Sequence, residues 1–290
     1  MNIFRPKGTD REMGGGPPGG RRVLPWSWGL LLALIIFPVV CLSGGAAWGA
    51  EAFLEDLHYS VDVLLWRDAA RARITLKSLG GGKYLAEISG RPQGMLKTLS
   101  GSDREERMQT EMAWRQGRLQ PLVYREESRR RGKLHLKEYR FDYDRGRLEL
   151  WELKGEALVY KWHTTLTGPI YDPLSGFYNC RLGLLGPIQD GQVFKLKGIP
   201  YPKPEDIEVQ VGPETPEGRK TMILIRGEAY KDKPAPVFAF FDPTMVPKHA
   251  WTRIWGFGKI TGELLPGGKG LKGLKPEVAA HREVGAVPES

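Results

Sequence analysis

Short runs of alternating apolar and polar residues, each closed by turn residues, follow one another from about residue 57 to residue 264. Neighbouring side chains of a β-strand point to opposite faces, so a period of two indicates strands that bury one face. The 37 Gly and 22 Pro residues supply frequent breaks, which suit short strands better than a helical bundle. The pattern predicts a mainly β fold with strands over residues 58–66, 70–77, 83–89, 134–143, 148–153, 157–163, 192–197, 207–211, 221–229, 237–241, 249–255 and 258–264.

Three turns make the predicted hairpins specific: Gly-Gly-Gly at 80–82, Asp-Arg-Gly at 144–146 and Lys-Gly at 154–155. Such sequences favour the tight turns that join antiparallel strands. The last two turns predict that the strands within residues 134–163 form a meander. No segment alternates strands with long helices, which excludes a doubly wound α/β fold.

Two segments are expected to be helical. Residues 93–99 form a short amphipathic turn or helix, and residues 172–185 are the stronger candidate because apolar residues recur there at helical spacing. Asp172 can cap the second helix, with Pro173 at its first position. We therefore expect a curved antiparallel sheet or half-barrel with one or two short helices packed on it.

An apolar stretch precedes the β-rich region. Residues 23–50 contain no ionisable side chain except Cys41; two arginines precede the stretch and small residues end it. This order is typical of a secretory signal peptide, cleaved after Gly49 or Ala50. The alternative is an uncleaved inner-membrane anchor over residues 23–50. Under either interpretation the rest of the chain is exported, and the periplasm is the expected compartment. Two start codons are open, Met1 and Met13.

The remaining chain is expected to hold one β-rich extracytoplasmic domain over residues 51–265 and a disordered, mostly polar tail over residues 266–290. Within the domain, the proline-rich segment 198–220 is expected to make an exposed connection around a short strand. The whole chain has a formal net charge of +9, but residues 51–265 carry only about +5. A mildly basic domain of mixed sign is not typical of a nucleic-acid binder.

Motifs for catalysis or metal binding are missing from the sequence. Cleavage would leave Cys180 alone, which excludes an internal disulfide and a cysteine-based metal site. The five histidines are far apart, no HExxH or GxSxG motif occurs, and Gly-Gly-Gly-Lys at 80–83 lacks the spacing of a phosphate-binding loop. We therefore expect no enzyme, no metal and no cofactor.

The basic run over residues 125–133 raises the question of a polyanionic partner. Glu126 and Glu127 interrupt the positive field, and an exported protein does not meet nucleic acid. Lipid headgroups or an acidic envelope polymer are the available anions, although a solvated strand end and turn explains the run more simply.

The second helix is the strongest candidate for a ligand site, because it combines aromatic groups with a few hydrogen-bonding ones. If this helix packs across a sheet, its apolar side chains would contact a ligand and its polar side chains would hydrogen-bond to it. The alternative is a core helix whose arginine pairs with a nearby carboxylate. The candidate ligand-binding residues are Asp172, Leu174, Ser175, Phe177, Tyr178 and Arg181.

Five of those residues carry a resemblance to a known family. Asp-x-Leu-Ser-x-x-Tyr-x-x-Arg over residues 172–181, read with Phe141-Asp142 upstream and Val246-Pro247 and Gly262-Glu263-Leu264 downstream, resembles the bacterial family catalogued as domain of unknown function 3108. The resemblance covers residues 53–265. It implies an exported, β-rich chain without a settled activity, whose layout is similar to the half-barrels of periplasmic lipoprotein carriers.

These observations favour a non-catalytic envelope protein that binds an apolar or amphipathic, lipid-like molecule in the concavity of its sheet. The alternative is a structural or protein-interaction module of the cell envelope, which docks another envelope protein through a sheet edge or a basic surface.

Overall fold

The structure is a computed structural model of the chain that describes residues 53–100, 104–130, 132–199, 203–226, 236–254 and 258–271. These residues form one sheet of 15 strands and two short helices, which confirms the predicted mainly β fold. The predicted signal peptide or anchor at residues 1–50 lies outside the described residues. Within the described part of the chain, no helix is both long and apolar enough to cross a membrane.

The strands of the sheet are distributed along the chain from Phe53 to Leu264. Its helices are α2 (Gly94–Ser100) and α3 (Pro173–Arg181). Its strands are β1 (Phe53–Val63), β2 (Trp66–Gly80), β3 (Lys83–Pro92), β4 (Glu105–Arg115), β5 (Arg118–Arg130), β6 (Lys133–Asp142), β7 (Arg147–Lys154), β8 (Ala157–Thr165), β9 (Ile170–Tyr171), β10 (Val193–Gly198), β11 (Glu205–Thr215), β12 (Gly218–Ile225), β13 (Val237–Phe241), β14 (Pro247–Ile254) and β15 (Gly258–Leu264).

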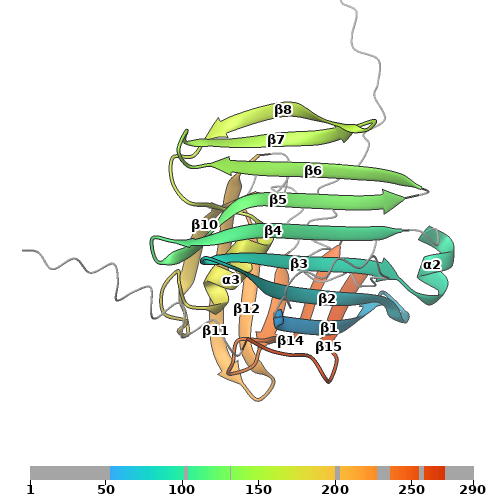
Figure 1. Cartoon of the computed structure of the whole chain (residues 1–290). Helices are drawn as coiled ribbons and strands as arrows, with labels where there is room; N and C mark the ends of the chain where they lie inside the picture. The colour runs from blue at the N-terminus through green and yellow to red at the C-terminus, as the bar shows by residue number, and fades with distance from the viewer. Residues whose placement is uncertain are drawn as a thin grey trace, which may run out of the picture.

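The strand order is β8-β7-β6-β5-β4-β3-β2-β1-β15-β14-β13-β12-β11-β10-β9. All neighbours are antiparallel except β9 and β10, which are parallel. The first and last strands therefore meet in the middle of the sheet, and β8 and β9 form its two edges. Figure 1 shows that the sheet folds over, so that β10–β14 cross behind β1–β5 and α3 lies between the two layers.

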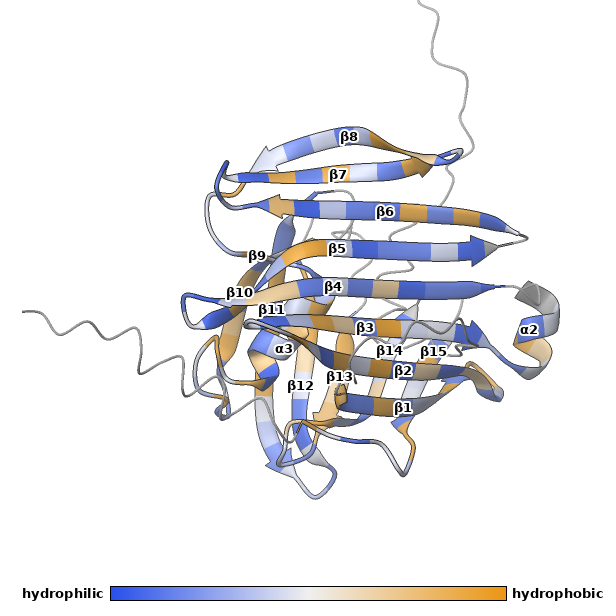
Figure 2. Ribbon diagram, viewed as in Figure 1, coloured by the Kyte–Doolittle hydropathy of each residue, from blue (hydrophilic) through white to orange (hydrophobic). Residues whose placement is uncertain are grey.

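The core lies between these layers. Along β1, Leu57, Tyr59, Val61 and Val63 are buried while the residues between them are more exposed. In Figure 2, orange hydrophobic bands interrupt the blue hydrophilic ones along β3 and β6. One face of β1 is therefore buried in the core, as the period of two predicts.

Two long strands, β4 and β5, were not among the predicted ones. Of these two strands, β4 holds Met108, Thr110 and Met112 at its inward positions, so its contrast with the polar outward residues is weak. Their turn is Gln116-Gly117, with φ of 51° and 74°, a conformation that Asn-Gly more commonly signals. β11 is also longer than the five-residue strand expected in the proline-rich segment.

Both helices occur where helices were predicted, but α3 ends at Arg181 rather than residue 185. Gly183 follows with φ of 67°, the left-handed conformation that ends helices.

The predicted disordered tail needs a correction at its start. Within residues 266–271, Lys269 forms an isolated bridge with Asp56 of β1, through backbone hydrogen bonds of 2.8 and 2.7 Å. A main-chain pairing thus extends the sheet one step past β15. Residues 272–290 lie outside the described part of the chain.

Candidate functional site

Asp172 is the N-cap residue of α3 and is hydrogen-bonded to β4. Its Oδ1 atom accepts hydrogen bonds from the backbone N–H groups of Leu174 (2.9 Å) and Ser175 (3.1 Å). The Ser175 hydroxyl accepts from the Asp172 N–H at 3.0 Å, which completes a capping box. Thr110 of β4 donates to the same Oδ1 atom at 2.5 Å. These contacts fix the first turn of the helix against the sheet.

The other carboxylate oxygen of Asp172, Oδ2, is buried without a hydrogen-bond partner. Burial raises the pKa of Asp172, although the hydrogen bonds from Ser175, Thr110 and the backbone oppose this shift. A carboxylate in this position is therefore costly when it is charged.

We expect Asp172→Asn to gain stability relative to the native chain as the pH rises. A carboxyl whose folded pKa is raised contributes stability that is fully present below its unfolded pKa, about 3.9. That contribution is lost as the pH rises through the folded value, whereas asparagine caps the helix equally well at every pH. Urea unfolding between about pH 4 and 8 checks this. A constant difference between the two chains would contradict it, and the exposed Asp190→Asn serves as the control.

The Asn179 side chain hydrogen-bonds to backbone groups at the start of β5 that have no partner on β6. β6 pairs with β5 only from Val123 onward, so earlier backbone groups on that edge need other partners. The Asn179 side chain accepts from the Leu119 N–H at 3.0 Å and donates to the Leu119 carbonyl at 2.7 Å. Tyr143 donates to the carbonyl of Pro121 at 3.0 Å, and proline has no N–H to satisfy. The helix is thereby hydrogen-bonded to the edge of β5.

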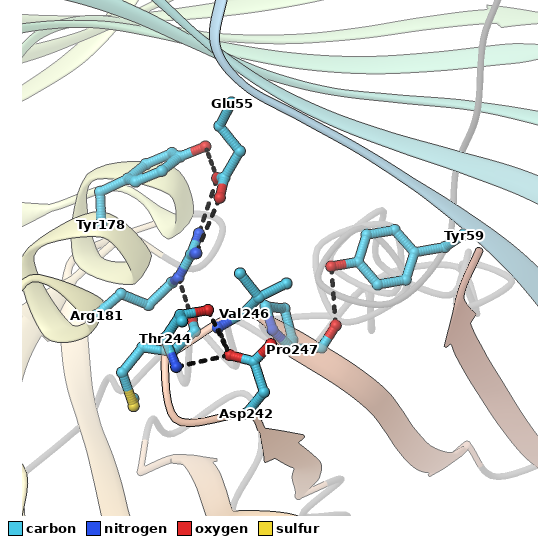
Figure 3. A network of polar contacts seen from close by, with 9 residues as sticks. Glu55, Tyr59, Tyr178, Arg181, Asp242, Thr244, Val246 and Pro247 are labelled. Carbon is cyan, nitrogen blue, oxygen red and sulfur yellow. Dashed lines mark hydrogen bonds and ion pairs between the residues drawn. The ribbon is translucent and has the colours of Figure 1, made fainter. Parts of the chain in front are cut away.

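Arg181 forms a buried ion pair with Glu55 of β1 (Figure 3). Its Nη1 and Nη2 atoms donate to the two carboxylate oxygens at 2.8 and 2.9 Å. Tyr178 donates to the same carboxylate at 2.8 Å. The side chains of Arg181 and Glu55 are 1% and 0% exposed, so solvent does not screen this pair.

The guanidinium of Arg181 has further partners. Its Nε donates to the carbonyl of Met245, which lies in the β13–β14 turn and has a left-handed φ of 61°. The Phe177 ring lies 4.9 Å from the guanidinium carbon, within cation–π distance. Burial alone would lower the pKa of Arg181, but Glu55 raises it. The charged pair thus joins β1, α3 and the β13–β14 turn.

The turn that presents Met245 is itself held by Asp242. The Oδ1 atom of Asp242 accepts hydrogen bonds from the Thr244 and Val246 N–H groups at 2.9 and 3.0 Å. Tyr59 of β1 donates to the Pro247 carbonyl at 3.0 Å. Figure 3 shows these contacts beside the ion pair.

Sequence reasoning missed Glu55, although a signal existed. The inward register of β1, read backward from Val61 through Tyr59 and Leu57, reaches Glu55. A charge at an inward position needs an opposite charge. The predicted strand began at residue 58, which left Glu55 outside the pattern.

An apolar cavity of about 80 Å³ lies between α3 and strands β10–β13. The helix contributes Phe177 and Cys180, and burial raises the Cys180 pKa to about 11. The strands contribute aliphatic side chains, and the Oγ1 atom of Thr221 is buried there without a hydrogen-bond partner. The aliphatic lining residues on the strands and nearby loop are Ile188, Leu196, Ile199, Ile207, Val209, Val211, Ile223 and Ile225.

The six predicted site residues divide between the two sides of α3. Asp172, Phe177 and Arg181 line the apolar cavity. The others, Leu174, Ser175 and Tyr178, do not line it and are buried in the core. Oδ1 of Asp172 accepts from Thr110 and the first turn of the helix, and the guanidinium of Arg181 donates to Glu55 and Met245. The motif therefore mainly holds α3 in place. Within the described ranges, no group of three His, Cys, Asp or Glu side chains could hold a metal ion.

Comparison with known proteins gives a family and a distant structural likeness. The family model described as "Protein of unknown function (DUF3108)" matches residues 56–217. No curated protein matches the chain significantly. The crystal structure of a β-barrel-like protein of domain of unknown function DUF1849 from Brucella abortus is similar, with 10% identity and a TM-score of 0.44. The likeness covers 73% of this chain and 94% of that one.

Proposed function

We propose, from the premise that the chain belongs to the DUF3108 family of proteins of unknown function, that it is a non-catalytic protein of the cell envelope that binds an apolar or amphipathic, lipid-like molecule. The observation that carries the proposal is the apolar cavity between α3 and β10–β13. Hydrocarbon surfaces facing a void favour an apolar guest, because such a guest restores the missing dispersion contacts.

The size of the cavity limits what enters it. Sites for whole small molecules occupy about 300–1,000 Å³, whereas this cavity holds about 80 Å³. A short apolar end, such as the tip of an acyl chain, fits, while the rest of the ligand lies outside the cavity.

The cellular place of this binding follows from residues 23–50. Their apolar composition supports export to the periplasm, with anchoring to the inner membrane as the alternative. Either route brings the domain to a compartment bounded by membranes, where lipid-like molecules are present. N-terminal sequencing of the protein from the cell envelope distinguishes cleavage from anchoring.

Native mass spectrometry of the purified protein, before and after lipid extraction, tests the proposal. We expect a co-purifying apolar molecule or, after extraction, binding of added dodecanoate. Cys180 lines the cavity, so Cys180→Leu should weaken dodecanoate binding by about fivefold or more, equivalent to about 1 kcal/mol. Cys180→Ser conserves the volume and should bind like the native chain. A folded Leu variant with native affinity, or a native chain that binds no apolar molecule, contradicts the proposal.

One observation favours the alternative of an interaction module. β8 is an edge strand of the sheet, and its Val159 and Tyr160 are 39% and 40% exposed. An exposed edge offers unpaired backbone groups to a partner strand. If docking is the function, an envelope protein captured by the native chain should be lost with Val159→Lys, because a lysine at an edge opposes strand addition.

A further inference from the structure

A second hollow, separate from the apolar cavity, lies beside α2 at the far end of β2–β4 from α3. It is a groove of about 780 Å³, and none of its described lining residues lines the apolar cavity. Its volume falls within the range of sites for whole small molecules. Among the described lining residues, Glu105 is the one carboxylate, against five side chains that carry a full positive charge: Arg71, Arg91, Lys97, Arg104 and Arg129.

We propose that this groove binds an organic anion that carries at least two phosphate or carboxylate groups. This site is independent of the proposed apolar ligand, because it uses different residues and the opposite kind of chemistry.

Strand register aligns the charges in one row. Arg71 of β2 is directly opposite Arg91 of β3, and Glu105 of β4 is directly opposite Arg129 of β5. The Nη2 atom of Arg91 lies 3.2 Å from the Glu105 carboxylate, which joins the two halves of the row. Two like charges directly opposite each other destabilise a sheet, and a bound anion would remove that cost.

The protein neutralises only part of this charge. Arg71 pairs with Asp68, Arg91 with Glu105, and Arg104 with Glu106. Lys97 and Arg129 are exposed, and neither has an acidic partner among the described residues. A hollow with an excess of one sign of charge concentrates ions of the opposite sign, so the groove should attract anions at low ionic strength.

The spread of the charges defines the ligand. Neighbouring strands are about 4.8 Å apart, so a row from β2 to β5 extends over roughly 14 Å. A single phosphate cannot contact both ends of such a row, whereas a bisphosphate or dicarboxylate can approach several cations together. Guanidinium groups favour these planar or tetrahedral oxyanions because they donate paired hydrogen bonds. A free bisphosphate and a diphosphate lipid headgroup share this chemistry.

Isothermal titration calorimetry with fructose 1,6-bisphosphate, together with co-sedimentation on phosphatidylcholine vesicles with and without cardiolipin, tests the proposal. The groove variant is Lys97→Gln/Arg129→Gln, which removes the two cations without acidic partners. Because both side chains are exposed, the variant should keep the native unfolding free energy. The charge-matched control is Lys248→Gln/Arg253→Gln, two exposed cations of β14 outside the groove.

We expect the native chain and the control to bind at least one probe at low ionic strength. The groove variant should bind it at least about tenfold more weakly. If the groove variant loses binding of fructose 1,6-bisphosphate but not of cardiolipin vesicles, the natural ligand is a free solute. If it loses binding of cardiolipin vesicles but not of the bisphosphate, the ligand is a lipid headgroup. Equal weakening in both variants, or no binding of either probe to the native chain, overturns the proposal.

Discussion

Replacing Arg181 with methionine should lower the free energy of unfolding by about 3 to 5 kcal/mol, because it leaves a buried carboxylate without its counter-charge. Glu55 is fully buried, and Tyr178 would be the one hydrogen-bond donor left to it among the described residues. The loss would be a large share of the stability of a typical domain, about 5 to 15 kcal/mol. Urea unfolding followed by circular dichroism measures it.

The double variant Glu55→Gln/Arg181→Met separates the charge from the shape of the side chains. A neutral glutamine can still accept the hydrogen bond from Tyr178, so the double variant should be more stable than Arg181→Met alone. As a surface control, Lys197→Met breaks an ion pair with Asp206 whose side chains are 49% and 71% exposed. It should cost no more than about 1 kcal/mol. Equal losses for Lys197→Met and Arg181→Met would disprove the special role of the buried pair.

Asn179→Ala should lower the free energy of unfolding by about 2 to 4 kcal/mol, because it leaves the Leu119 N–H and carbonyl unpaired at a buried strand edge. Both groups bond to the Asn179 side chain, which also donates to the Ser175 carbonyl at 2.7 Å. Tyr143→Phe removes one donor from the same edge and should cost about 1 kcal/mol. The order of the two losses follows the number of backbone groups left unpaired.

Hydrogen exchange gives a local measurement of the same effect. We expect the Leu119 amide to exchange faster in Asn179→Ala, beyond the increase that global destabilisation explains. Gln120→Ala, on the same strand as Leu119, removes an exposed side-chain contact to Gln116 of the β4–β5 turn and should leave the Leu119 amide protected. Unchanged protection of that amide in Asn179→Ala would show that another group bonds to it.

Local patterns predicted the fold class and much of its detail. The Gly80–Gly82 turn, the 134–163 meander and the start of α3 at Asp172 were all predicted correctly, because each depends on residues within a few positions. β4 and β5 were both missed; in β4, Met and Thr hold inward positions in place of the usual aliphatic residues. The end of α3 was placed too late because Gly183 ends the helix before the apolar spacing does.

The ligand site assigned to α3 stays a prediction. Two of its residues, Phe177 and Arg181, line a cavity. The polar motif residues, however, make internal contacts whose partners lie far away in the chain, at Thr110 and Glu55. No spacing rule connects such positions, so the pattern could not distinguish a ligand contact from a structural one.

The sequence by itself determined the β-rich class, most of the hairpins and the capped helix, because alternation, turn residues and caps act over short stretches of chain. Only the tertiary structure decided what Arg181 pairs with, since Glu55 lies 126 positions earlier. It also decided where the hollows are. The apolar cavity needs α3 packed against β10–β13, and the basic groove needs β2 to β5 in register beside α2. These features depend on which distant strands become neighbours, and that is settled when the two layers of the sheet close on one core.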